Sequence, residues 1–287
     1  MKKQSGFTLI ELMIAGLIGA FILTGLMNLF ITTNKSVTLS DSLSQNQSTG
    51  RFAMDYLTRY IRTAGYSKDF TQFTPPLYIA SGSGATVIDC TGPQAAACAA
   101  NNPTTFPATI LGDRLSIPFV VGANPEDLTR SCTGTDVGGP ANGTQSLVNV
   151  FWVSAEADTI RQLRCRTFSR DLNRWLDNPV SIINNVERFE FQVGIASEEN
   201  DRYASRYVSV DTIEADASIN LNYVRSIRVS VLTTSQDNLD DKKVQSTLRE
   251  RSFGLLDAPI FKIKDHNLRN IFSNTIELPN MIESAGS

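Results

Sequence analysis

The chain begins with a long run of apolar residues that follows a short basic segment. Residues 12–34 carry no charged side chain. An α-helix of that length extends roughly 34 Å, which is enough to cross the ~30 Å hydrocarbon core of a bilayer. Lys2 and Lys3 precede the run, and basic residues favour the cytoplasmic side of a membrane. The pattern therefore predicts a membrane helix with its amino end inside and the rest of the chain outside.

Helical periodicity continues beyond the apolar run in an amphipathic form. Apolar residues recur at intervals of three and four, with charged residues largely on the other side. Gly65 is a suitable residue to end the helix, because glycine adopts the left-handed conformation that often follows the last turn. We therefore expect an amphipathic helical segment over 35–65. Its apolar positions are Leu39, Leu43, Ala53, Leu57, Tyr60, Ile61 and Ala64.

Residues 66–287 show the alternation typical of antiparallel strands. In the stretch 186–194, apolar Phe189 and Phe191 alternate with charged Arg188 and Glu190, which predicts a half-buried strand. Stretches rich in Pro, Gly, Ser and Asn between the strands predict turns and long loops. We therefore expect an α+β chain with a large β-rich head. The other expected strands lie in 114–121, 147–154, 159–165 and 224–234, and the loop-rich stretches are 71–112 and 122–146.

Composition adds little beyond excluding some partners. Hydrophobic residues make up 41% of the chain and charged residues 19%, which are ordinary values for a globular protein. The formal net charge is −3, so no strongly basic field indicates general nucleic-acid binding.

Four cysteines lie on the predicted outer side of the membrane, where disulfides persist. Four cysteines allow three connectivities, and the sequence alone leaves the choice open. We favour Cys90 with Cys98, which closes a short loop, and Cys132 with Cys165, which joins a Gly-rich segment to a strand. A metal site is not expected, because the chain has no C-x-x-C pair and only one histidine, His266.

One charge at the start of the apolar run needs an explanation. Glu11 stands in an otherwise membrane-like helix, where a carboxylate at the bilayer centre costs about 3 kcal/mol by insertion scales. A removable secretory signal would explain the basic start and apolar run, but its apolar region covers only about 7 to 15 residues. An uncleaved anchor with Glu11 near the membrane interface is the other simple interpretation.

The segment KKQSGFTLIELMIAG, residues 2–16, resembles the class III signal of type IV pilins and type II secretion pseudopilins. The resemblance implies that a prepilin peptidase removes the leader 1–6 by cutting between Gly6 and Phe7, and that Phe7 is then N-methylated. It also implies a transmembrane and filament-core helix over 7–34. Glu11 becomes the fifth residue of the mature chain, where the family keeps a glutamate that pairs with the amino group of a neighbouring subunit. A buried carboxylate is tolerable when it is paired in this way.

The order of the later motifs resembles the PilW-like minor pilins, which are related to the J-type minor pseudopilins of type II secretion. The motifs are Gly65-Tyr66, GDRLSIPF, Cys132-Thr133-Gly134, LRC, NNVERFEFQVG, DRYASRYV, VRSIRVSVL and LRNIFSNTIELPN, the last with Pro279 where the related strand usually ends in Arg-Asn. The resemblance implies a type IV pilin-like α+β fold, in which a long N-terminal helical spine packs against a large antiparallel β head.

This resemblance also implies where the protein acts and with what. Before assembly, the chain would be a single-pass protein of the inner membrane with its head in the periplasm. After assembly, it would be part of the pilus, at its tip. Expected partners are other minor pilins, the major pilin, the prepilin peptidase and the inner-membrane assembly platform, with a tip adhesin as a further candidate. The alternatives are a J-type minor pseudopilin and, from another class, an anchored adhesin or carbohydrate-binding protein with an exposed aromatic cluster.

Catalysis is not expected, and neither is a cofactor. The chain has no G-x-S-x-G elbow, no P-loop and no G-x-G-x-x-G segment. The loop SEENDRY, residues 197–203, offers oxygen ligands of the kind that Ca²⁺ takes, but it lacks the EF-hand spacing.

Overall fold

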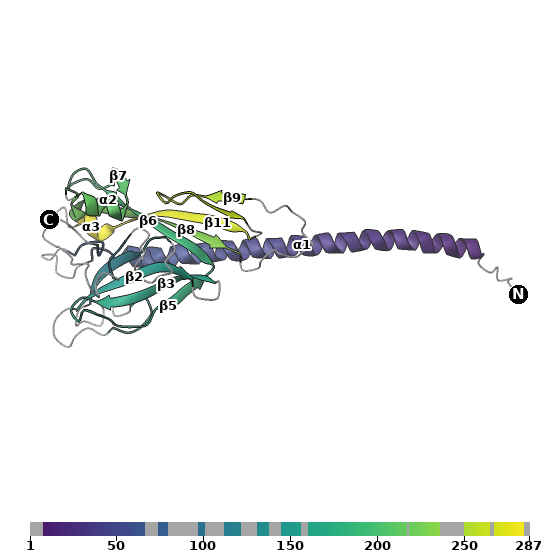
Figure 1. The fold of residues 1–287 in the computed structure, drawn as a ribbon, viewed down its shortest axis with the longest axis horizontal. Coiled ribbons are helices and arrows are strands. Elements are labelled where there is room, and N and C mark those ends of the chain that lie inside the picture. The colour runs from purple at the N-terminus through teal and green to yellow at the C-terminus, as the bar shows by residue number, and fades with distance from the viewer. Residues whose placement is uncertain are drawn as a thin grey trace. The chain divides into compact units, whose positions relative to one another are not determined.

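A computed structural model describes most of the chain, which divides into two compact units, Met1–Gln45 and Asn46–Ser287 (Figure 1). The described residues are 8–66, 74–79, 97–100, 112–121, 131–137, 145–155, 160–216, 218–235, 250–264 and 267–283.

The first element is a single long helix, α1 (Leu9–Ile61). The helix ends four residues before Gly65, because the amides of Thr63 and Ala64 bond to carbonyls three residues back rather than four, a tightening common at helix ends. Gly65 itself has a φ of +74°, as expected for the residue that turns the chain away from a helix.

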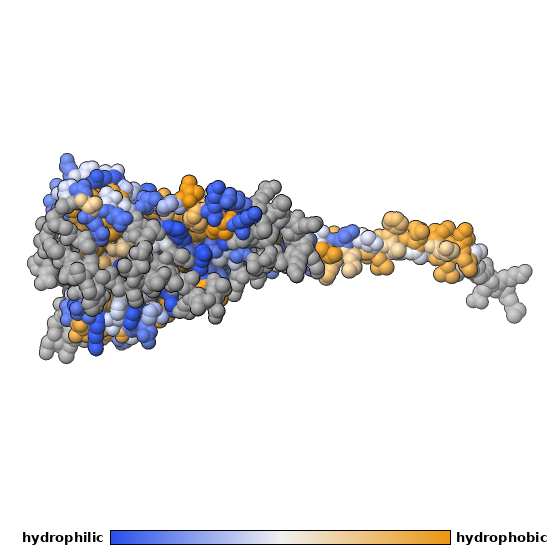
Figure 2. Space-filling view, viewed as in Figure 1, coloured by the Kyte–Doolittle hydropathy of each residue, from blue (hydrophilic) through white to orange (hydrophobic). Residues whose placement is uncertain are grey.

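In the first unit, α1 is apolar and exposed. It is long and apolar enough to cross a membrane, with a mean hydropathy of 2.2 over its most apolar window, none of which is buried. Figure 2 shows these apolar residues gathered on the surface of this part of the helix. Large side chains from Leu9 to Phe30 are more than half exposed, so this surface is suited to lipid or to other helices rather than to water.

The head contains two antiparallel sheets and a hairpin. One sheet has the order β1-β2-β3-β4, with β5 also pairing with β3; the other has the order β11-β8-β6-β7; and β9 pairs with β10. The predicted α+β architecture, a long N-terminal helix followed by antiparallel sheets, is confirmed. The strands are β1 (Leu115–Val121), β2 (Gln145–Ala155), β3 (Arg161–Ser169), β4 (Arg174–Trp175), β5 (Val180–Asn184), β6 (Val186–Ile195), β7 (Arg206–Val208), β8 (Val224–Thr234), β9 (Glu250–Phe253), β10 (Phe261–Lys264) and β11 (Arg269–Glu277).

The end of α1 forms part of the core of the second unit. Its predicted apolar positions Ala53, Leu57 and Ile61 are fully buried and share one hydrophobic cluster with residues of both sheets. Gly50 allows β11 to come close, because a Cβ at this position would overlap the ring of Phe272. Leu39 and Leu43 were expected on the same apolar face, but in the first unit they are not buried. Their side chains are 42% and 37% exposed.

The expectation of a half-buried β6 was wrong. Phe189 and Phe191 face the core as predicted, but Glu190 on the opposite face is also fully buried. The hairpin β9–β10 lies over that face, where Arg188 stacks on Phe261 and Arg269 stacks on Phe253. A tertiary cover of this kind leaves no trace in the alternation of the strand.

Short elements complete the head. The helices α2 (Val210–Ala215) and α3 (Pro279–Glu283) and the 3₁₀ turn η2 (Leu221–Tyr223) were not predicted. Pro279 follows the end of β11 and begins α3, a position that suits a residue with a fixed φ and no N–H. The side-chain amide of Asn280 donates to the carbonyls of Arg62 and Ala64, at 3.3 and 3.1 Å, so α3 closes the turn that follows α1.

Candidate functional site

The predicted cleavage residues Gly6 and Phe7 lie outside the described residues, but the assembly residue Glu11 is described. The backbone N–H and the hydroxyl of Thr8 both donate to Glu11 Oε2, at 3.0 and 2.9 Å, and the Glu11 amide faces Thr8 Oγ1 at 3.4 Å. This is a capping box, in which residues at the first turn satisfy helix N–H groups reciprocally.

Glu11 therefore caps the start of α1, a local structural role that was not predicted. The spacing Thr-x-x-Glu before an apolar run was the available signal. Both hydrogen bonds end on the same carboxylate oxygen, and the side chain stands among exposed apolar residues of α1 such as Leu9 and Leu12.

Inside the head, the predicted pairing of Cys132 with Cys165 is confirmed. The disulfide joins the segment 131–137 to β3, with a Cα–Cα distance of 6.2 Å, and both residues are buried. The other predicted pairing, Cys90 with Cys98, is not described because Cys90 lies outside the described residues.

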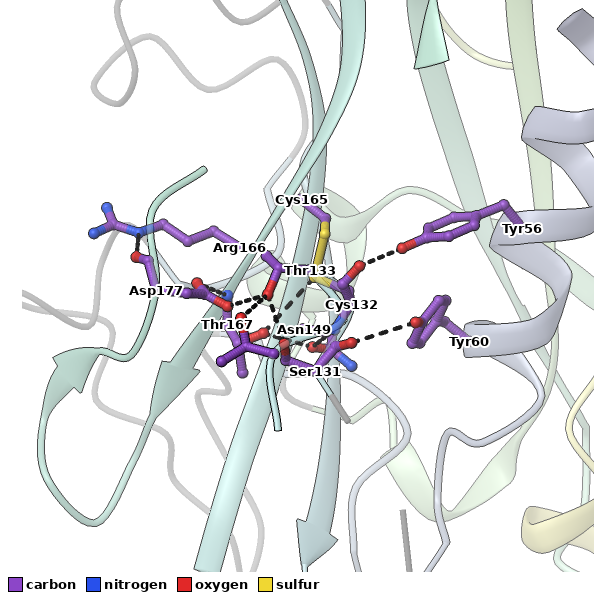
Figure 3. Close-up of a disulfide and its surroundings, with 11 residues drawn as sticks. Tyr56, Tyr60, Ser131, Cys132, Thr133, Asn149, Cys165, Arg166, Thr167 and Asp177 are labelled. Atoms are coloured by element: carbon purple, nitrogen blue, oxygen red, sulfur yellow. Dashed lines mark hydrogen bonds between the residues drawn. A yellow bond between two sulfur atoms is a disulfide. The ribbon is translucent and has the colours of Figure 1, made fainter. Parts of the chain in front are cut away.

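A polar network surrounds this disulfide (Figure 3). Asn149 Oδ1, on β2, accepts from the Cys132 amide and from the Thr167 hydroxyl, both at 3.0 Å. The Asp177 carboxylate accepts from the Thr133 hydroxyl at 2.6 Å and from the Thr167 amide at 2.9 Å. Side chains from β2, β3 and the segment after β4 thus hold the disulfide segment on the sheet.

Two tyrosines connect this segment to α1. The hydroxyl of Tyr56 donates to the carbonyl of Cys132, and the hydroxyl of Tyr60 lies 3.4 Å from the carbonyl of Ser131 (Figure 3). Burial raises the pKa of Tyr56, and the neighbouring Tyr60 raises it further, so the Tyr56 hydroxyl keeps its proton and remains a donor. The disulfide segment is therefore fixed to both the sheet and the helix, which indicates a structural role.

The loop that offered oxygen ligands is held by an arginine. Arg225 is 1% exposed, and its guanidinium donates to the carbonyls of Glu199 and Asp201, the latter at 2.7 Å. It also donates to the carbonyl of Asn222 at 2.6 Å. Carbonyl oxygens that could have faced a metal ion thus face a cationic side chain, and among the described residues no group of three His, Cys, Asp or Glu side chains is placed to hold one. His266 lies outside those residues.

Glu190 is the most deeply buried carboxylate of the described head. It forms an ion pair with Arg188 at 2.5 Å. Burial raises the pKa of Glu190, although a hydrogen bond shared with the Asp113 carboxyl group, a hydrogen bond from Arg188 and the charge of Arg188 act in the opposite direction. The nearby Glu187 has a stronger partner, because Arg269 donates to both of its carboxylate oxygens at 2.6 and 2.8 Å.

Two protein-family models match this chain, one at its N-terminal helix and one in its head. Residues 1–27 match the prokaryotic N-terminal methylation motif, and residues 150–280 match the family described as type IV pilus-assembly protein W. No match was found among curated protein sequences. A solved structure of a type IV-like pilin from Thermus thermophilus aligns with a TM-score of 0.38 and 16% identity, covering 85% of this chain and 96% of that one.

A methylation motif at the start of a long apolar helix, followed by an antiparallel β head, defines a type IV pilin-like protein. Within that class the chain is similar to the pilus-assembly protein W family over residues 150–280, from within β2 to the start of α3. The apolar helix and the methylation motif fit anchoring in a membrane and incorporation into a pilus.

Proposed function

We propose that this protein is a minor pilin that primes assembly of a type IV pilus and ends at its tip. Prepilin peptidase cuts between Gly6 and Phe7, and the mature chain copolymerises with other minor pilins on the inner-membrane assembly platform. The head is periplasmic before assembly and belongs to the pilus afterwards. The chain has no catalytic role in this proposal.

The observation that carries the proposal is the exposed apolar part of α1. None of its most apolar window is buried within the chain, so the free energy of covering it must come from another molecule. Lipid covers it in the membrane, and the corresponding helices of neighbouring subunits cover it in a filament. Glu11 would then meet the amino group of Phe7 in a neighbouring subunit, which gives one charge inside an apolar bundle a partner.

The size of the head supports a minor rather than a major subunit. Residues 66–287 form a large head with two sheets and a hairpin. A major subunit repeats along a helical lattice in which every head meets identical neighbours, and a head of this size is difficult to fit at every step. A subunit at the tip has no neighbour above it.

The two alternatives differ in what supports them. A J-type pseudopilin of type II secretion would have the same helix and head, and the genes next to this one would separate it from a pilin of the pilus. An anchored adhesin would need an exposed aromatic cluster. In the described head, Phe52 and Tyr203 are the aromatic side chains that are more than half exposed, and no ring contact joins them, so no observation favours this alternative.

Deletion of the gene tests the proposed function. Pili should disappear from a deletion strain that keeps its retraction motor, because without a priming subunit the fibres start more slowly than they are retracted. Pili should return in part when the motor is also removed. Normal pilus numbers in the deletion strain that keeps its motor would contradict the proposal, as would complete loss of secretion with unchanged pili.

A further inference from the structure

The C-terminal strand β11 is an open edge of the second sheet within the described chain. It pairs with β8 on one side through nine consecutive residue pairs, without a bulge. The Leu278 amide donates to the Arg225 carbonyl, and the Ser235 amide donates to the Leu268 carbonyl. Because hydrogen-bonded pairs alternate along an antiparallel ladder, even-numbered residues of β11 bond to β8, and odd-numbered residues direct their N–H and C=O groups away from it.

The outward groups of this edge are available to another strand. No hydrogen bond within the described part of the chain uses the backbone N–H or C=O of Ser273, Thr275 or Glu277. Natural edge strands are commonly protected by proline, lysine or a bulge, whereas the sequence from Ser273 to Glu277 contains none of these. The exposed side chains there are short and polar, except for Glu277 at the end.

A groove follows the same stretch of β11. It has a volume of about 610 Å³ and lies between β11 and the end of α1. Asn274–Glu277 form one wall, Thr58 and Arg62 form the other, and Arg202 and Pro279 complete it. All of these residues belong to the second unit. The groove therefore leaves room beside the open strand for an extended chain.

The charges of the groove indicate the chemistry of its occupant. Arg62 and Arg202 are exposed and form no ion pair with other described residues, whereas Glu277 is the single acid in the lining. Two arginines against one glutamate favour a segment that carries carboxylate side chains, because arginine binds carboxylates through paired hydrogen bonds.

We propose that an extended, acidic segment of another pilin subunit pairs with the outer edge of β11 and lies in this groove. Three outward residues, Ser273, Thr275 and Glu277, would each exchange N–H and C=O groups with it, as in recognition by strand addition. Carboxylates of the segment would meet Arg62 and Arg202. The inference rests on the proposed function, because it takes the occupant from the subunits with which the chain copolymerises.

Site-specific photo-crosslinking tests this proposal in the full-length chain. A benzophenone amino acid replaces the groove residue Asn274 in membranes that also contain the other pilin subunits, and mass spectrometry identifies the adduct. We expect an adduct with an acid-containing segment from the head of another pilin. Thr275→Pro removes one outward N–H and should lower the adduct yield at least tenfold, while the bonds to β8 from neighbouring residues remain.

A proline in another edge strand is the matched control. The Asn185 amide donates to the Arg161 carbonyl, so Asn184 of β5 directs its N–H away from β3, and Asn184→Pro should leave the adduct yield within twofold. The surface variant Arg62→Glu with Arg202→Glu should also lower the yield at least tenfold without touching the strand. Fluorescence melting of each variant checks that the head is folded.

Four results would overturn the proposal. An adduct that Thr275→Pro leaves unchanged, or one with the apolar helix of a partner, would show that no strand pairs there. Absence of an adduct while the tagged chain still co-purifies with other pilins would refute the docking site alone. Absence of both would remove the proposed function as well.

Discussion

Replacing Cys132 and Cys165 together with alanine is expected to lower the free energy of unfolding of the head by about 3.7 kcal/mol. The bond joins residues that are 33 apart in sequence, and the chain-entropy relation for a loop of that length gives about 3.7 kcal/mol at 25 °C. Alanine is the suitable replacement, because a serine hydroxyl would need a new hydrogen-bond partner at a buried position.

The remaining contacts limit the loss to about that value. The Cys132 amide still meets Asn149, and the Tyr56 hydroxyl still meets the Cys132 carbonyl. Tyr56→Phe alone should cost about 1 kcal/mol, the typical net contribution of one hydrogen bond.

The assay is thermal unfolding of the full chain in detergent, followed by tryptophan fluorescence. Trp152 and Trp175 are the two tryptophans of the sequence, and both lie in the head, so the signal reports the unit that contains the disulfide. A loss of about 3.7 kcal/mol corresponds to a fall in Tm of about 7–15 °C for a domain of 150–250 residues.

The predicted pair Cys90–Cys98 provides a comparison. It would enclose a shorter loop, for which the same relation gives about 2.5 kcal/mol, so its removal should cost less. A fall in Tm of under 3 °C for the Cys132/Cys165 variant, or a smaller effect than that of the Cys90/Cys98 variant, would refute the view that this bond anchors the head.

Three further predictions concern processing, assembly and pH. Gly6→Val should block prepilin peptidase and leave a precursor heavier by the leader hexapeptide, as mass spectrometry can show; mature fibres from this variant would contradict the assignment. Glu11→Ala and Glu11→Gln should both be inserted and cleaved but should give fewer crosslinks to the helices of partners. Glutamine keeps the capping box with Thr8 but removes the charge. If Glu11→Gln crosslinks as the wild type does while Glu11→Ala does not, helix capping rather than an ion pair explains this residue. Glu190 has a raised folded-state pKa, so the folded head binds its proton more tightly and loses stability as the pH rises above the ordinary carboxyl value of 4.5. Relative to the wild type, Glu190→Gln should therefore gain stability from pH 4 to pH 7 in urea titrations; a constant difference across that range would show that Glu190 is not a buried, proton-binding group.

The alternation of apolar and polar residues was sufficient to locate the long strands β6 and β8. The expected strand 224–234 coincides with β8, and the expected stretch 186–194 differs from β6 by one residue. Alternation identified the core faces of both strands, because the side chains that repeat every second residue are the ones that pack on α1.

Tertiary contacts explain what the pattern did not predict. Glu190 is buried beside Gly112 and Asp113, more than seventy residues earlier in the chain. Arg225 is buried because three carbonyls of a turn and a loop converge on it. Glu190 leaves the alternation of β6 intact, because it lies on the face opposite Phe189 and Phe191. Arg225 has the same parity as Ile227 and Val229 of β8, but it stands where the pairing of β8 with β6 shifts register. The role of Thr8 in the helix cap, in contrast, was present in the local sequence and could have been predicted.

The position of the head in the fibre tests the central claim most directly. Immunogold labelling of sheared pili with antibodies against residues 66–287 should place single gold particles at one end of the fibres, with the shaft unlabelled. Regular decoration along the shaft would contradict a tip position, and fibres without any label would contradict incorporation into the pilus.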